Sequence, residues 1–173
     1  MIDRSTPPLK SLYQQLILDH YRKPRNRGEL DDRTVEVLMR NPTCGDEITL
    51  QLKIEDERIA DVKFLGDGCS ISQASVSMMT TILKGESLDT AHHVATRFTK
   101  MMHGDEDAAR DPDLGNLRSL AGVAKFPVRI KCALLGFDAL QEAMKKNRGE
   151  ADNGSGADDG SGAEEPEQDI SDT

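Results

Sequence analysis

The chain has 173 residues and a formal net charge of −9, with two Tyr, four Phe and no Trp. This length is sufficient for one domain with an aliphatic core. The sequence has no run of about twenty apolar residues, which argues against a membrane-spanning helix, and its first residues lack the apolar stretch of a signal peptide. We therefore expect a cytoplasmic protein whose three cysteines stay reduced instead of forming a disulfide framework.

The negative charge is confined to the end of the sequence. Residues 150–173 contain nine Asp and Glu residues and no Lys or Arg, whereas the other 149 residues carry 22 acidic and 22 basic side chains. Because this larger part is balanced in charge and poor in aromatic residues, nothing in it indicates nucleic-acid binding. The last segment is too polar to bury an apolar surface. We predict a domain at residues 1–149, followed by a disordered acidic tail at 150–173.

The first predicted element is an amphipathic helix over residues 9–21, where apolar residues recur at helical spacing. It ends before Pro24, because the residue before a proline avoids the helical conformation. A short basic loop closed by Gly28 follows. Such a loop is most commonly a solvated, charged surface, but it could also be a docking patch for an acidic partner. Its basic residues are Arg22, Lys23, Arg25 and Arg27.

Three strands are predicted next, over residues 34–38, 47–55 and 58–65. The second has the clearest pattern, because aliphatic residues alternate with polar ones, as in a strand with one buried face. These aliphatic residues are Ile48, Leu50, Leu52 and Ile54. Residues 56–57 form a candidate two-residue turn between the second and third strands. We expect the three strands to pair in an antiparallel sheet.

The rest of the domain is predicted to be helical, in segments at residues 70–85, 87–102, 114–124 and 127–146. Ser70 and Gln73 fit a capping box at the start of the first segment, Ser87 fits the N-cap of the second, and Pro127 fits the first turn of the last. The acidic stretch at 104–112 is predicted to be a loop. Three histidines are expected at the surface: His92, His93 and His103.

The sequence Asn41-Pro42-Thr43-Cys44-Gly45-Asp46 lies between the first two predicted strands. Gly45 can adopt a positive φ at little cost, so the thiol of Cys44 and the carboxylate of Asp46 can point to one place. Two such groups need a cation between them, and zinc accepts both. The same residue types are common in plain turns, and this stretch alone favours a turn.

The other two cysteines make a metal site a stronger hypothesis. If the strands at 47–55 and 58–65 pair as a hairpin, Cys69 meets Cys44 and Asp46 at one end of the sheet. Cys132 joins them if the last helix packs across that end, and Arg129, three positions earlier, shares its region of the surface. Because the spacing is not that of a paired structural zinc motif, buried cysteines without a metal remain the alternative.

Several stretches carry a resemblance to a known family. They include Asn41-Pro42-Thr43-Cys44-Gly45-Asp46, Gly66-Asp67-Gly68-Cys69-Ser70-Ile71-Ser72 and Lys125-Phe126-Pro127-Val128-Arg129-Ile130-Lys131-Cys132. With Asp19-His20-Tyr21 and Pro24-Arg25-Asn26, they cover most of residues 9–147 and resemble the U-type iron–sulfur cluster assembly family. The resemblance implies an α+β fold, with a three-stranded antiparallel sheet and helices packed on it. It also implies zinc on Cys44, Asp46, Cys69 and Cys132, and a cysteine desulfurase as partner.

Two departures concern the role within that family. In its ISC branch, His comes directly before the last cysteine, and a proline-rich chaperone-recognition segment lies upstream. This chain has Lys131 at that position and a different segment at 125–129. The acidic insertion at 104–112 also resembles the SUF branch.

These features favour a zinc-dependent sulfurtransferase, with Cys44 and Arg129 as catalytic residues. It would take persulfide sulfur from a desulfurase and pass it to a downstream iron–sulfur scaffold. The alternatives are a scaffold that itself carries a transient iron–sulfur cluster, and a binding module whose zinc is purely structural.

Overall fold

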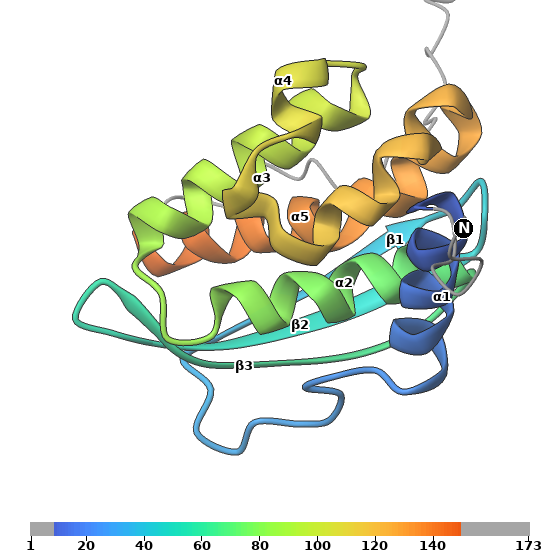
Figure 1. Cartoon of the computed structure of the whole chain (residues 1–173). Coiled ribbons are helices and arrows are strands. Elements are labelled where there is room, and N and C mark those ends of the chain that lie inside the picture. Colours follow the sequence, from blue (N-terminus) through green and yellow to red (C-terminus); the bar gives the residue numbers. More distant parts are fainter. Residues whose placement is uncertain (1–8, 150–173) are drawn as a thin grey trace, which may run out of the picture.

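The computed structural model describes residues 9–149 (Figure 1). Its elements are, in chain order, α1 (Leu9–Arg22), β1 (Val35–Asn41), β2 (Asp46–Glu55), β3 (Arg58–Asp67), α2 (Ser70–Leu83), α3 (Leu88–Met102), α4 (Glu106–Ala109), η1 (Pro112–Lys125) and α5 (Pro127–Asn147). This confirms the predicted α+β class. The predictions for the N-terminal residues before α1 and for the acidic tail at 150–173 lie outside the described residues.

The strands form one antiparallel sheet in the order β1-β2-β3, as predicted. β1 is longer than the predicted 34–38, because it continues to Asn41, which pairs with Asp46 at the start of β2. On the other side of β2, Glu47 pairs with Asp67 at the end of β3. The start of β2 therefore lies between the ends of its two neighbours. This places the residues that follow β1 and β3 at the same end of the sheet.

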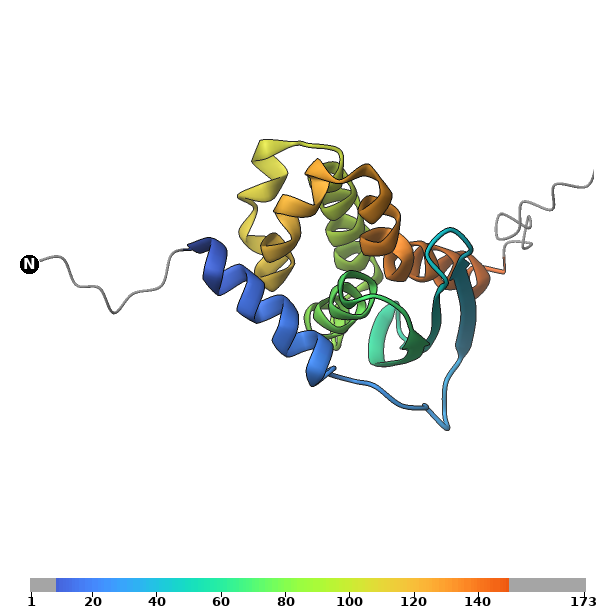
Figure 2. The ribbon, with the colours of Figure 1, turned by 90° about the vertical axis from the view of Figure 1, so that its right-hand side faces the viewer.

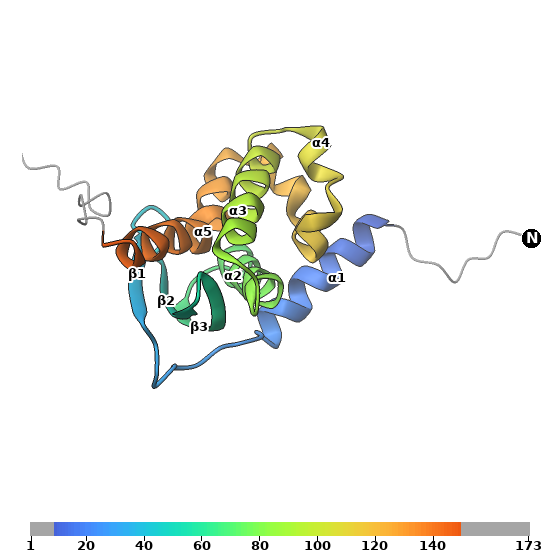
Figure 3. The same ribbon diagram turned by 90° about the vertical axis from the view of Figure 1, so that its left-hand side faces the viewer.

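Helices α2 and α5 cover one face of this sheet, with α5 against β1 and β2 and α2 against β3 (Figures 2 and 3). α1 packs against α2, while α3 and η1 add a further layer. The core between these layers is aliphatic, as the composition predicts, and includes Met78 and Met79. Phe98 and Phe137 stack there, with ring centroids 4.4 Å apart. None of the described helices has the length and apolar run needed to cross a bilayer.

The predicted capping box at the start of α2 is wrong. Ser70 is the first helical residue, and the N-cap is Cys69, which makes no side-chain capping bond. The Gln73 side chain donates to Ser72 Oγ at 3.2 Å instead of reaching back to the cap. The prediction for α3 is confirmed, because Ser87 accepts the backbone N–H of the third helical residue.

The acidic insertion is more ordered than the predicted loop at 104–112. Asp105 caps a single helical turn, α4, by accepting a backbone N–H with its carboxylate. The following segment, predicted as a helix at 114–124, is the 3₁₀-type element η1 with a break at Gly115. The N-cap side chains Asp105 and Asp111 explain why this segment is helical, because they accept backbone N–H groups that a loop would leave to water.

A buried histidine joins the basic loop to the core. His20 is only 3% exposed, and its Nδ1 lies 2.8 Å from Ser77 Oγ on α2. The same hydroxyl accepts the backbone N–H of Arg25, whose guanidinium pairs with Asp19 at 2.5 Å. Burial, and next the charge of Arg25, lower the pKa of His20, which favours its neutral form. Part of the basic loop is therefore held by internal contacts, and its role as a docking patch stays a prediction.

Gly136 sets how closely α2 and α5 approach each other. A Cβ at this position would lie 3.0 Å from Val76 Cβ and 3.4 Å from Val76 Cα. Neither atom is the end of a flexible side chain, so the two helices would have to move apart. Because α5 also carries Cys132, this contact contributes to the placement of the cysteine.

We expect Gly136→Ala to destabilise the domain by about 1–2 kcal/mol, since overpacking a tight core contact outweighs the gain of up to about 1 kcal/mol in helix propensity. Urea unfolding measures this difference. Gly122→Ala is the matched control, because a Cβ added there would meet no heavy atom within 4 Å. If Gly136→Ala unfolded at the same urea concentration as the unchanged protein, the inferred close packing would be wrong.

Candidate metal site

The turn between β1 and β2 presents Cys44 and Asp46. Asn41 shapes this turn, because its carbonyl accepts the N–H of Gly45 at 2.9 Å and its side chain accepts the N–H of Thr43 at 3.2 Å. Gly45 has a φ of 70°, which glycine adopts without strain. Cys44 is half-buried, and Asp46 is 1% exposed. The stretch is thus both the turn and the place where a thiol and a carboxylate converge.

Asp46 connects this turn to the start of α2. Its Oδ1 accepts the backbone N–H of Cys69 at 2.8 Å, and its Oδ2 lies 3.9 Å from Cys69 Sγ. The approach is close because the residue before Cys69 is Gly68. A Cβ at Gly68 would overlap the Asp46 carboxylate. The predicted β2–β3 hairpin is therefore confirmed, and it brings Cys69, after the end of β3, to Asp46 at the start of β2.

Cys132 reaches the turn from the other side. It is fully buried in the first turns of α5, which packs on β1 and β2. Its thiol donates to Cys44 Sγ at 3.3 Å, and Asn41 Nδ2 lies 3.9 Å from its sulfur. In Figure 1, the β1–β2 turn, the start of α2 and the start of α5 lie at the same end of the molecule. Helix α5 thus packs across that end, as the hypothesis requires.

We call these four residues, Cys44, Asp46, Cys69 and Cys132, the cysteine–aspartate site. Ligand atoms of Cys44, Asp46 and Cys132 all lie within 4.8 Å of one another, and Cys69 joins them through Asp46. Burial, and next the neighbouring Asp46 and Cys44, raise the pKa of the Cys132 thiol. A cation among these groups would lower the pKa of the thiol again, because its charge favours the thiolate. The donor set and its convergence therefore fit a metal with sulfur and oxygen ligands.

Arg129 is exposed at the edge of the cysteine–aspartate site. Negative charge on Cys69, followed by a hydrogen bond to Cys132, raises the pKa of the Arg129 guanidinium. This proximity agrees with the prediction that it shares the region of Cys132. Lys131, also exposed, is on the same turn of α5.

Two further residues support the site. In the sequence Asn41 has only the signal of a turn former, but its amide also approaches Cys132. Ser72 is fully buried, its Oγ donates to the Cys69 carbonyl at 3.1 Å, and it lies 3.9 Å from Cys69 Sγ. A serine three positions after a cysteine at a helix start is a weak signal, because serine is common there for capping alone.

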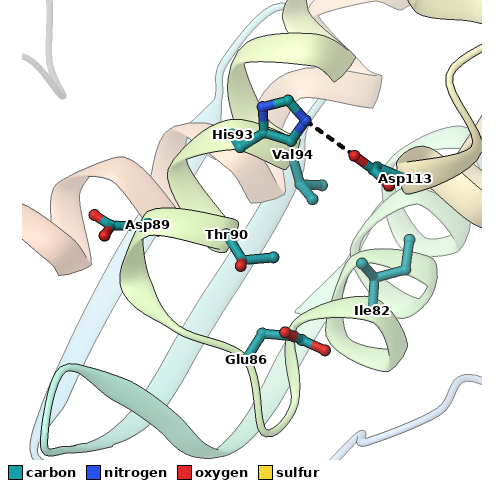
Figure 4. A pocket seen from close by; sticks show the side chains of 7 residues that line it. All are labelled: Ile82, Glu86, Asp89, Thr90, His93, Val94 and Asp113. Atoms are coloured by element: carbon teal, nitrogen blue, oxygen red, sulfur yellow. Dashed lines mark hydrogen bonds and ion pairs between the residues drawn. The ribbon is translucent and has the colours of Figure 1, made fainter.

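A cavity lies far from the cysteines, between α2, α3 and η1 (Figure 4). Its volume is about 500 Å³, and its lining includes Ile82, His93 and Asp113. Ile82 is close to the last residue of α2 and Cys69 precedes the first, so about 20 Å separates the two sites.

His93 contacts Asp113 at 3.2 Å, and Asp111 lies near both. Asp111, however, is paired with Arg97 at 2.6 Å. The cavity therefore does not provide a comparable set of metal ligands. The predicted surface location of His92, His93 and His103 is confirmed.

Comparisons with known proteins identify the family of this chain. Residues 12–152 match the family model described as NifU-like N terminal domain. The chain is 49% identical to the zinc-dependent sulfurtransferase SufU of Bacillus subtilis over 82% of this chain and 95% of that protein. It is 45% identical to the iron–sulfur cluster assembly scaffold protein IscU of Streptococcus pyogenes, over 80% of this chain and 86% of that protein.

A solved structure shows the same fold. The N-terminal NifU-like protein of Brucella abortus superposes with a TM-score of 0.73 over 83% of this chain and 99% of that one, at 22% identity. The four residues of the cysteine–aspartate site all lie within residues 12–152, which match the family model. By its family match and by both relatives, the chain belongs to the NifU-like N-terminal domain family.

Proposed function

We propose that this protein is a zinc-dependent sulfurtransferase for iron–sulfur cluster assembly, which accepts persulfide sulfur from a cysteine desulfurase. One observation carries the proposal: three thiols and a carboxylate converge at one end of the sheet, and Cys44 is on an exposed turn. The similarity to a relative named as a zinc-dependent sulfurtransferase supports it. A downstream iron–sulfur scaffold would then receive the sulfur.

The zinc ligands in this proposal are Cys44, Asp46, Cys69 and Cys132. Zinc prefers four ligands and accepts thiolate sulfur and carboxylate oxygen. With three thiolates and one carboxylate, the site would carry a net charge of about −2, which Arg129 and Lys131 partly offset. When bound, zinc keeps the thiols deprotonated near neutral pH and, because it has no redox chemistry, protects them without passing electrons.

Cys44 is the proposed sulfur acceptor. It is half-buried on a turn that contains Gly45, whereas Cys69 is the N-cap of α2 and Cys132 is fully buried within α5. A turn residue can move toward a partner at a lower cost than a residue inside a helix. Cys44 thiolate attacks the outer sulfur of the donor persulfide. The donor S–S bond breaks, the donor cysteine leaves as a thiolate, and Cys44 keeps the transferred sulfur.

Arg129 is proposed to assist this transfer. Its guanidinium is exposed and interacts with both Cys69 and Cys132, so its charge stands at the entrance to the site. A fixed positive charge favours the thiolate forms that exchange sulfur. Its exposure also lets it contact an acidic group on an incoming desulfurase.

Cluster assembly on the protein itself is the second candidate. The same four side chains could hold a cluster, and a relative 45% identical to this chain is named as a scaffold. Lys131 in the position before the last cysteine favours the sulfur-accepting role, as the family resemblance implies. A purely structural zinc is the remaining alternative, and it predicts no sulfur acceptance.

The transferred sulfur is expected on Cys44. After a single turnover with desulfurase and cysteine, peptide mass spectrometry should find one added sulfur atom on Cys44. Cys44→Ser should accept no sulfur. Full acceptance by Cys44→Ser, or an added sulfur on Cys69 alone, would contradict the mechanism.

Removal of the metal is expected to destabilise the protein. Because the ligands come from three separate segments, metal binding should also stabilise the fold. At a zinc concentration about a thousandfold above the dissociation constant the gain is roughly 4 kcal/mol, so chelation should lower the melting temperature by roughly 10 °C. Calorimetry with and without chelator measures this shift. Asp46→Ala should weaken zinc retention, whereas His93→Ala should keep its zinc; zinc loss in the latter would refute the ligand assignment.

The charge of Arg129 is expected to speed sulfur transfer. Arg129→Gln should slow sulfur transfer by about tenfold, as expected for loss of a charge-assisted contact worth roughly 1.5 kcal/mol, while zinc content stays unchanged. Arg129→Lys should recover part of the rate, since it keeps the charge. Lys125→Gln, a charge change on the same exposed segment, is the matched control. Equal rates for Arg129→Gln and Lys125→Gln would show that Arg129 has no specific role.

A further inference from the structure

Cys132 is placed directly behind Cys44. The two sulfur atoms are 3.3 Å apart, which is within hydrogen-bonding distance for two sulfurs. Cys132 is fully buried, whereas Cys44 is half-exposed. Sulfur delivered by another protein must arrive on the exposed side of Cys44. The outer sulfur of a Cys44 persulfide would therefore lie opposite Cys132, with Cys44 Sγ between them.

We infer that, when zinc is lost, Cys132 acts as a resolving thiol that releases the sulfur of a Cys44 persulfide as sulfide. This would be a second activity of the site, because it ends sulfur transfer instead of continuing it. The inference rests on the proposed function only in that Cys44 carries a persulfide. It adds a fate for that persulfide and assigns a reactive role to Cys132.

The reaction is balanced without an added oxidant or reductant. Cys132 sulfur attacks Cys44 Sγ, and a new S–S bond forms between the two cysteines. The bond between Cys44 Sγ and the outer sulfur breaks, and its electron pair leaves with the outer sulfur. The Cys44 persulfide reacts as its anion, so the proton of the Cys132 thiol passes to the departing sulfur, which leaves as HS⁻. The outer sulfur is reduced by two electrons, and the two cysteine sulfurs are oxidised to a disulfide.

The structure favours Cys132 over Cys69 as the resolving thiol. Cys132 belongs to the group whose ligand atoms all lie within 4.8 Å of one another, together with Cys44 and Asp46. Cys69 is outside that group, and its sulfur faces the Asp46 carboxylate at 3.9 Å. Asn41, whose amide lies 3.9 Å from Cys132 Sγ, also forms the turn that carries Cys44. Asn41 therefore contacts Cys132 and also shapes the turn that positions Cys44.

Zinc on the cysteine–aspartate site would prevent this reaction. A metal-bound thiolate is a weaker nucleophile than a free one, and thiol–disulfide exchange slows with falling nucleophilicity. With Cys132 engaged as a ligand, a persulfide on Cys44 would last until it is passed on. The zinc content of the protein would therefore decide between sulfur transfer and sulfide release.

The test uses the full chain, zinc-loaded or stripped by a chelator, and glutathione persulfide as the sulfur donor. After excess donor is removed by gel filtration, released sulfide and peptide masses are followed. The zinc-free chain should release about one sulfide per persulfide and yield a disulfide-linked peptide pair joining Cys44 to Cys132. The zinc-loaded chain should keep its persulfide at least tenfold longer.

Cys132→Ser without zinc should keep the sulfur on Cys44 and release little sulfide. A stable persulfide in the zinc-free unchanged chain, or a disulfide from Cys44 to Cys69, would overturn the inference. Peptide mapping of the unchanged chain decides this even if Cys132→Ser does not fold. The small donor also separates the two proposals, because failure of the desulfurase to load Cys44 would refute the proposed function alone.

Discussion

The hydrogen bond from the Cys69 backbone N–H to Asp46 Oδ1, at 2.8 Å, is the contact on which the site depends. It connects the first residue of β2 to the N-cap of α2, so one carboxylate satisfies a helix terminus and borders the thiols at the same time. Gly68 makes this approach possible, since any side chain there would collide with the carboxylate. A change at either residue would therefore disturb the helix start and the ligand geometry together.

The arrangement is electrostatically costly without a cation. Three thiols and a carboxylate lie within contact distances, two of these residues are almost fully buried, and burial raises the pKa of Cys132. Buried groups of like charge are stable only when an opposite charge or a proton offsets them. Zinc would supply that charge from within the site, and Arg129 supplies part of it from outside. The same crowding brings Cys132 close enough to Cys44 for direct sulfur chemistry.

The three cysteines differ in local structure and in exposure to solvent. Cys44 is on a turn at the surface, Cys69 caps a helix, and Cys132 is buried under the turn. Cys44 and Cys69 are both partly exposed, whereas Cys132 is buried, and of the two accessible cysteines only Cys44 is on a turn rather than at a helix start. The cavity bordered by His93 and Asp113 contains no cysteine; its His93 contacts Asp113, and the nearby Asp111 pairs with Arg97.

The sequence by itself determined the three strands and most of the helices, and it predicted that Cys44, Asp46 and Cys69 gather at one end of the sheet, because alternating residues at 48–54 and residues that flank paired strands have direct geometric consequences. It could not determine the cap of α2 or the turn of helix at α4, since serine and aspartate fit several local structures equally well. Only the tertiary structure placed Cys132 behind Cys44. This contact depends on how α5 packs against β1 and β2, which no local pattern encodes.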